Sequence, residues 1–108
     1  MTYRGAVVDL DGTVVRGGDP IPGALDALAA LRERVDRVLF LTNNPTVPPA
    51  EYARRLRALG VEATTEDVLT ATTATIHYLR EHHAESEILP IAEDSVVDPL
   101  RDADLALT

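Results

Sequence analysis

Two aspartates, Asp9 and Asp11, stand two positions apart at the end of the short apolar run Ala6–Leu10. If this run is a strand, residues two apart project from the same face, so both carboxylates are presented at its carboxyl end. Gly12 follows at once, and glycine lets the backbone turn sharply and approach a ligand closely. Because Mg²⁺ prefers oxygen ligands, such a strand end is suited to magnesium-dependent chemistry on a phosphate group.

A second polar cluster, Thr42-Asn43-Asn44, follows another apolar run, Arg37–Leu41. A strand, a helix and a second strand in succession predict a right-handed crossover and parallel pairing. In a parallel sheet the carboxyl ends of the strands lie at one edge, and ligands bind beyond that edge. We therefore expect the paired aspartates and the Thr42–Asn43 step to face one crevice.

The elements that must position these clusters alternate between strand and helix. The run Ala6–Leu10 is short, apolar and partly β-branched, which is typical of a buried strand. Glycines and prolines indicate a loop or flap over Gly12–Pro22, and Gly60 fits the left-handed position past a helix end. The sequence predicts an α/β fold with a Rossmann-like parallel sheet, with further strands at Arg37–Leu41 and Glu87–Ala92, a capped helical turn at Thr65–Val68, and helices at Gly23–Val35, Ala50–Leu59, Thr72–His83 and Asp94–Asp102.

Composition narrows the functional classes. The 108 residues carry a formal charge of −8, which makes nucleic acid and anionic membranes poor partners. There is no cysteine, so disulfides and thiolate metal sites are excluded, and all ten basic residues are arginine. No apolar run approaches the roughly 20 residues that span a bilayer, and the start lacks a secretory pattern. We expect a cytoplasmic protein.

The segment Asp9-Leu10-Asp11-Gly12-Thr13 resembles the first signature of the haloacid dehalogenase superfamily of phosphohydrolases, and Phe40-Leu41-Thr42-Asn43-Asn44-Pro45 resembles its second. The intervening Val14-Val15-Arg16-Gly17-Gly18 and Ile21-Pro22-Gly23-Ala24 are similar to class IIA, the NagD-like and para-nitrophenyl phosphatase group. The resemblance covers roughly residues 4–80. It implies residues 1–70 as the amino-terminal half of the hydrolase core, and residues 71–108 as the beginning of an inserted α/β cap domain, truncated.

The resemblance implies a magnesium-dependent phosphomonoester hydrolase that acts through an aspartyl-phosphate. Asp9 would be the nucleophile and a metal ligand. Asp11 would be the general acid and base, and would also hold the metal through its backbone carbonyl. The substrate would be a small phosphorylated metabolite.

Five further residues would bind the phosphate group. Gly12 and Thr13 would supply the turn and backbone amides near the phosphoryl oxygens. Thr42 and Asn43 would hold the transferred group, and Asn43 and Asn44 would donate backbone amides at the start of the following helix.

The chain lacks two features that the resemblance leads us to expect at the site, a basic residue that balances the phosphate charge and further acids that bind the metal. The family's third signature supplies a basic residue, usually lysine, and this chain has none. Its fourth supplies further acids for the metal, and the available acids Asp94 and Asp98 fall in the expected cap. We expect a truncated form or a fragment that lacks both features, with little activity alone.

Other interpretations of the same residues remain open. Asp11-Gly12 between two valine pairs also fits a β-hairpin, and Thr42–Pro45 taken alone fits an ordinary turn. The protein would then be a non-catalytic module, or one completed by another chain through an exposed sheet edge. Homo-oligomers through the cap or that edge are a further expectation. A receiver-like phosphoacceptor is a weaker third hypothesis, because such a domain needs a lysine.

Three other groups of residues have both a functional and an ordinary structural interpretation. The histidines His77, His82 and His83 do not share one helix face, which favours a solvated surface over a metal cluster. Arg54, Arg55 and Arg57 are expected on an exposed face, with substrate phosphate as the alternative. Tyr52 is expected in the core rather than stacked on a substrate.

Overall fold

A computed structural model describes residues 3–108 of the chain. By residue contacts the chain divides into two compact units. Unit 1 runs up to Thr42 and includes Pro49–Leu69, whereas unit 2 contains Asn43–Pro48 and Thr70–Thr108. The division into a core up to residue 70 and a cap from residue 71 stays a prediction.

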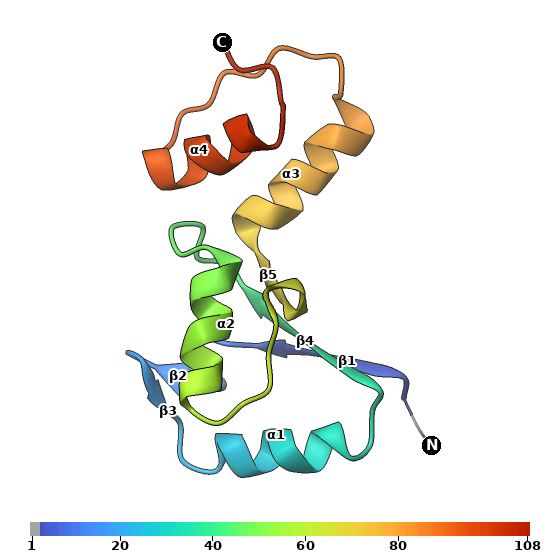
Figure 1. The fold of residues 1–108 in the computed structure, drawn as a ribbon, viewed down its shortest axis with the longest axis vertical. Coiled ribbons are helices and arrows are strands. Elements are labelled where there is room, and N and C mark those ends of the chain that lie inside the picture. The colour runs from blue at the N-terminus through green and yellow to red at the C-terminus, as the bar shows by residue number, and fades with distance from the viewer. Residues whose placement is uncertain (1–2) are drawn as a thin grey trace. The chain divides into compact units, whose positions relative to one another are not determined.

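The main sheet has three strands in the order β1-β4-β5 (Figure 1). Strand β1 (Gly5–Asp9) pairs in parallel with β4 (Arg37–Thr42), with Gly5 opposite Arg37 and Asp9 opposite Leu41. This pairing excludes a hairpin that folds the opening valines back on themselves. The predicted α/β fold with a parallel sheet is confirmed.

Two helices and a short turn complete unit 1: α1 (Ala24–Arg32), α2 (Pro49–Ala58) and a 3₁₀ turn, η1 (Thr65–Asp67). Gly23 precedes α1 with φ of 85°, and Gly60 follows α2 with φ of 88°. Gly60 therefore has the left-handed conformation expected past a helix end.

Only one face of the β1–β4 pair is covered by these helices. Val8 lines a small hollow of about 160 Å³ together with α1, and its register partner Phe40 is fully buried. On the opposite face Val7 is 61% exposed and Leu41 is 40% exposed. The prediction of a buried first strand is therefore wrong: within residues 3–108, β1 lies at the sheet edge with one face open.

The third strand is not where the sequence predicts it. It is β5 (Val68–Thr70), which follows η1, whereas Glu87–Ala92 forms only a single parallel bridge between Ile88 and Leu107. Pro90 has no N–H to donate to a ladder, which limits pairing in that segment.

The core of unit 1 is mostly aliphatic and includes Leu10, Val14, Leu28, Val38, Phe40, Tyr52, Ala53, Leu56, Val61, Ala63 and Val68.

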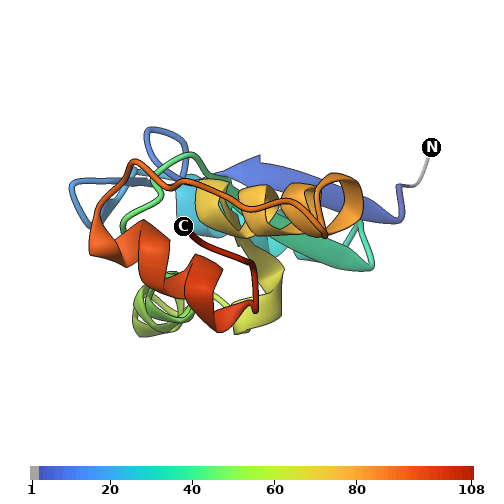
Figure 2. The same cartoon turned by 90° about the horizontal axis from the view of Figure 1, so that it is seen from above.

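Unit 2 contains α3 (Ala71–His82) and α4 (Asp94–Asp102), which contact each other (Figures 1 and 2). Thr70 caps α3, because its hydroxyl accepts a hydrogen bond from the Thr73 N–H at 3.1 Å. The Arg80 guanidinium of α3 donates to the Ala103 carbonyl just after α4, at 2.9 Å. Both helices lie where the sequence predicts them.

The predicted flap contains a small hairpin of β2 (Val15–Arg16) and β3 (Asp19–Pro20). Gly17 and Gly18 connect them with φ of 61° and 89°. Two positive φ values in a two-residue connection are typical of a type I′ turn, and glycine accepts them without steric cost.

Among residues 3–108, every helix is too short or too polar to span a bilayer.

Candidate active site

The site lies at the carboxyl end of β1, in a tight turn over residues 10–15. The Leu10 carbonyl accepts from the amide of Val14 at 2.9 Å, and the Gly12 N–H donates to the Val15 carbonyl at 2.8 Å. Leu10 is 1% exposed and Val14 is 2% exposed, so the turn is anchored in the core at both sides. Asp11 lies between these two buried residues, and Asp9 directly precedes them, so the backbone of both aspartates is held in place.

Each aspartate of the pair accepts a hydrogen bond from a threonine hydroxyl. Thr13 Oγ1 donates to Asp9 Oδ2 at 3.2 Å, and Thr42 Oγ1 donates to Asp11 Oδ2 at 3.0 Å. The second bond joins residues that are 31 positions apart in the sequence. The structure therefore brings Thr42 to Asp11, as the parallel arrangement of β1 and β4 predicts.

Tyr52 of α2 contacts Thr42 from the core side, and the sequence pattern predicts only a core position for it. Its side chain is 6% exposed, and its hydroxyl lies 3.4 Å from Thr42 Oγ1. A threonine hydroxyl has one proton, and Thr42 gives it to Asp11, so Tyr52 is the donor in this pair. The three residues Tyr52, Thr42 and Asp11 thus form a chain of hydrogen bonds from the core to the site.

Asn43 and Asn44 belong to unit 2, whereas Asp9 and Asp11 belong to unit 1. The Asn44 side chain accepts from the Thr46 N–H at 2.9 Å and from the Thr46 hydroxyl at 2.7 Å, which is an Asx turn. The following helix, α2, begins at Pro49. The expectation that Asn43 and Asn44 lie at a helix start is therefore wrong, because residues 45–48 separate them from α2. A helix dipole acts only within the first turn of its helix, so it does not reach these two residues.

The alternative interpretation of the arginines as phosphate ligands finds no support in their contacts. Arg54 and Arg55 both bind Glu51 on the surface of α2, at 2.6 and 3.1 Å. The hydrogen bond from Arg54 is the main cause that lowers the pKa of Glu51 to about 2. Arg57 donates to the Ala63 carbonyl at 2.8 Å and so holds the loop that leads towards β5.

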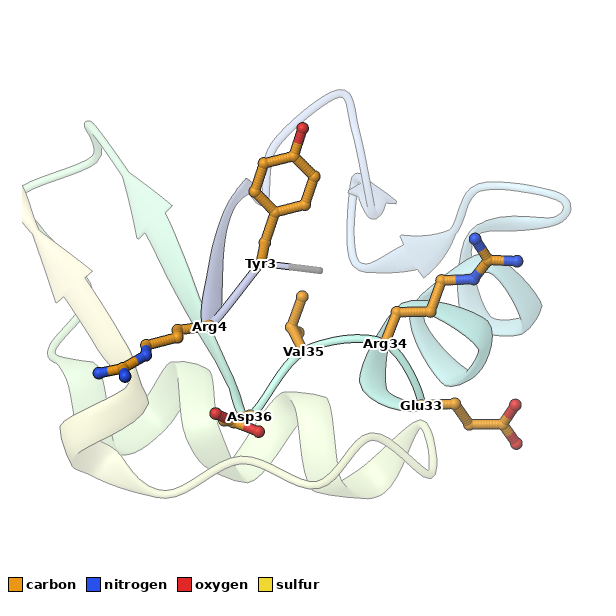
Figure 3. Close-up of a pocket in the computed structure, with 6 residues that line it drawn as sticks. All are labelled: Tyr3, Arg4, Glu33, Arg34, Val35 and Asp36. Atoms are coloured by element: carbon orange, nitrogen blue, oxygen red, sulfur yellow. The ribbon is translucent and has the colours of Figure 1, made fainter. Parts of the chain in front are cut away.

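A hollow of about 470 Å³ in unit 1 lies away from the aspartates, at the amino ends of β1 and β4. Figure 3 shows that the charged groups around it diverge: the guanidinium groups of Arg4 and Arg34 point in opposite directions, and the Glu33 carboxylate points outward. Groups that diverge cannot hold one ligand. We therefore place the candidate site at the strand carboxyl ends.

Oxygen donors at the turn fit a hydrated magnesium ion. Asp9 and Asp11 each present a carboxylate, and Mg²⁺ is commonly held by one or two carboxylates while it keeps several waters. Within residues 3–108, no group of three or more His, Asp or Glu gathers to hold a metal by itself. Asp9 and Asp11 therefore stay predicted metal ligands, and they would supply only part of the coordination of a Mg²⁺ ion.

Comparison with known proteins places this geometry in a family. The family model for haloacid dehalogenase-like hydrolases matches residues 6–106. The chain belongs to this family. Among its relatives is sugar phosphatase AraL of Bacillus subtilis, with 33% identity over 90% of this chain and 36% of that protein. The relatives identify it as a class IIA member of the haloacid dehalogenase superfamily.

Solved structures of the family have the same fold. A p-nitrophenyl phosphatase from Archaeoglobus fulgidus superposes on the whole chain with a TM-score of 0.86 and 26% identity. A glycerol phosphate phosphatase from Mycobacterium tuberculosis, solved in complex with magnesium, matches 98% of the chain with a TM-score of 0.80 and 31% identity. The chain spans 41% and 32% of these two proteins, well under half the length of either.

Proposed function

We propose that this chain carries the nucleophile and the acid–base half of a magnesium-dependent phosphomonoester hydrolase. The observation that supports this best is the 3.0 Å hydrogen bond from Thr42 to Asp11, because it joins the two family signatures at the carboxyl ends of the neighbouring strands β4 and β1. Relatives of the chain are named phosphatases, which agrees with the proposal.

In this proposal Asp9 attacks the phosphorus atom and forms an aspartyl-phosphate, while the alcohol of the substrate leaves. Asp11 gives a proton to the leaving oxygen and later takes one from the water that hydrolyses the intermediate. The two steps return Asp9 unchanged and release inorganic phosphate.

The remaining residues would hold the phosphoryl oxygens. The backbone amides of Gly12 and Thr13 lie in the turn after Asp11, but they donate to the Val15 and Leu10 carbonyls at 2.8 and 3.2 Å, so the turn must open before they can bind a phosphoryl oxygen. Asn43 and Asn44 would add donors from the loop after β4. The single hydroxyl proton of Thr42 is given to Asp11, so Thr42 must turn from the carboxylate to bind a phosphoryl oxygen.

Charge explains why the proposed site needs a cation. A phosphate beside two carboxylates is repelled by about 1 kcal/mol per pair of unit charges at 4 Å in water, and by about 4 kcal/mol at a surface-like dielectric. Asp9 and Asp11 would hold a Mg²⁺ ion, whose charge would offset this repulsion and polarise the phosphoryl oxygens. The chain itself has no lysine and a formal charge of −8, so it supplies little compensation.

For the substrate we propose a small phosphate monoester of a sugar or another polyol. The named activities of the relatives, sugar phosphatase and glycerol phosphate phosphatase, support this class. Because the chain spans 36% of the AraL sequence, groups that select the substrate in that relative can lie in its remaining part.

The test is a phosphatase assay with p-nitrophenyl phosphate and Mg²⁺. It compares the chain alone with a fusion to the part of AraL that the chain does not cover. We expect activity in the fusion and little in the chain alone. In the fusion, Asp9→Asn should lower kcat roughly a thousandfold or more, as removal of a catalytic nucleophile commonly does.

Asp26→Asn is the matched control, since Asp26 is an exposed acid in the first turn of α1, and this change should leave kcat unchanged. Full activity of the Asp9→Asn fusion would show that Asp9 is not the nucleophile.

A second candidate function is a non-catalytic module that another chain completes. The open face of the sheet favours it, because Val7 and Leu41 are exposed on a parallel sheet, and such sheets are normally covered on both faces. The partner would add apolar structure over this face and along the edge of β1.

Sedimentation over a range of concentrations, with a dye that binds exposed apolar surface, tests this candidate. Association and dye binding that both fall in a Val7→Lys variant are expected. A strict monomer that binds no dye would contradict it.

A further inference from the structure

The step from Asp11 to Gly12 is chemically the most reactive backbone position of the chain. It is the only Asp–Gly pair in the sequence. In such a pair the glycine amide nitrogen can attack the aspartate γ-carbon, because glycine has no Cβ to hinder the approach. Gly12 has φ of +82°, and the space beside its α-carbon is empty, since a Cβ built there would meet no atom within 4 Å.

The reaction and its products balance without a further reagent. The Gly12 nitrogen forms a bond to the Asp11 γ-carbon, and the carboxyl hydroxyl leaves with the amide proton as one water. Water then opens the five-membered imide at either carbonyl. One product is the original aspartate, and the other is isoaspartate, in which the backbone runs through the side chain.

Two hydrogen bonds in the structure oppose this ring closure. The Gly12 N–H, which must lose its proton, donates to the Val15 carbonyl at 2.8 Å. The Asp11 carboxylate accepts from Thr42 at 3.0 Å, and Thr42 is 5% exposed at the end of β4. Both bonds must open before the nitrogen can reach the γ-carbon.

We infer that Asp11–Gly12 is a site of isoaspartate formation. The hydrogen bond from Thr42 to Asp11 and the one from Gly12 to Val15 slow the reaction in the folded chain. Thr42 therefore protects the aspartate chemically, a role that is separate from any contact with a substrate. Isoaspartate at position 11 adds a methylene to the backbone and moves the carboxylate, so a modified molecule loses the geometry of the turn. This inference does not depend on the proposed hydrolase activity.

The test is an ageing experiment on the chain at neutral pH and physiological temperature. Isoaspartate at position 11 is measured over time by mass spectrometry with electron-transfer fragmentation, which distinguishes it from aspartate. The samples are the wild-type chain, its Thr42→Val variant and a free peptide of residues 7–16. Asp94–Ser95 serves as an internal reference in every sample of the full chain.

We expect the peptide to isomerise fastest and the wild-type chain slowest. Thr42→Val should isomerise about tenfold to a hundredfold faster than wild type, because a hydrogen bond to a charged group is lost. Thr75→Val is the matched control, since it removes a threonine hydroxyl that donates to the Ala71 carbonyl in α3, away from the turn after β1. Its rate at position 11 should equal that of wild type.

Thr42→Ser keeps the hydroxyl and should restore the wild-type rate. Equal rates in the wild-type chain and the peptide would overturn the inference, and so would a folded Thr42→Val chain that isomerises no faster than wild type. If Thr42→Val does not fold, Thr42→Ala takes its place, and a folded Thr42→Ala chain that isomerises no faster than wild type would overturn the inference.

Discussion

Removal of the Tyr52 hydroxyl tests whether the core supports the candidate site through Thr42. Tyr52→Phe keeps the buried ring and removes only the oxygen that lies 3.4 Å from Thr42 Oγ1. A net hydrogen bond is worth about 0.5–1.5 kcal/mol, and the long distance places this one in the lower half, at about 0.5–1 kcal/mol. For a domain of this size that corresponds to a fall in Tm of about 2–8 °C.

The assay is urea unfolding followed by circular dichroism, arranged as a double-mutant cycle with Thr42→Val. Once Thr42→Val has removed the partner, Tyr52→Phe should cost less than it does in the wild-type chain. Tyr78→Phe is the matched control, because Tyr78 is 56% exposed, and its change should lie within about 0.5 kcal/mol of wild type. Strict additivity in the cycle would show that Tyr52 and Thr42 do not interact.

Three further predictions concern the stability of the fold. Phe40→Ala should destabilise the chain by about 3–5 kcal/mol in urea unfolding, because Phe40 is fully buried in the central strand; a loss below about 1 kcal/mol would contradict its core position. The pKa of Asp67 is lowered, mainly because its carboxylate accepts from the Thr64 N–H at 2.9 Å. Its stabilisation is therefore complete above its ordinary pKa and is lost as pH falls through the lowered value. Asp67→Asn should cost about 0.5–1 kcal/mol at neutral pH and flatten the loss of stability in acid, measured by urea midpoints at several pH values; an unchanged acid profile would refute this. Asp104 has φ of 61°, so Asp104→Gly should be neutral or raise Tm slightly in a thermal melt, whereas Asp104→Val should lower it; equal melts would contradict the left-handed conformation.

The paired signatures could be predicted from the sequence because they depend on local chemistry and chain order. A strand with alternating side chains places Asp9 and Asp11 at one end, and a strand–helix–strand succession places Thr42 at the same edge. The bond from Thr42 to Asp11 confirms that expectation. The helices were also predictable, since glycines, prolines and threonines at their ends have strong local preferences.

Local pattern and chain order were therefore enough to predict the fold class, the helices and the two signatures that meet at Asp11 and Thr42. Three features became visible only in the folded chain: β1 lies at an edge with Val7 exposed, Val68–Thr70 is the third strand, and Tyr52 contacts Thr42. The physical reason is that pattern and propensity act between near neighbours in the chain. Strand order, the covering of a face and the partner of a buried hydroxyl depend on segments that are distant in sequence.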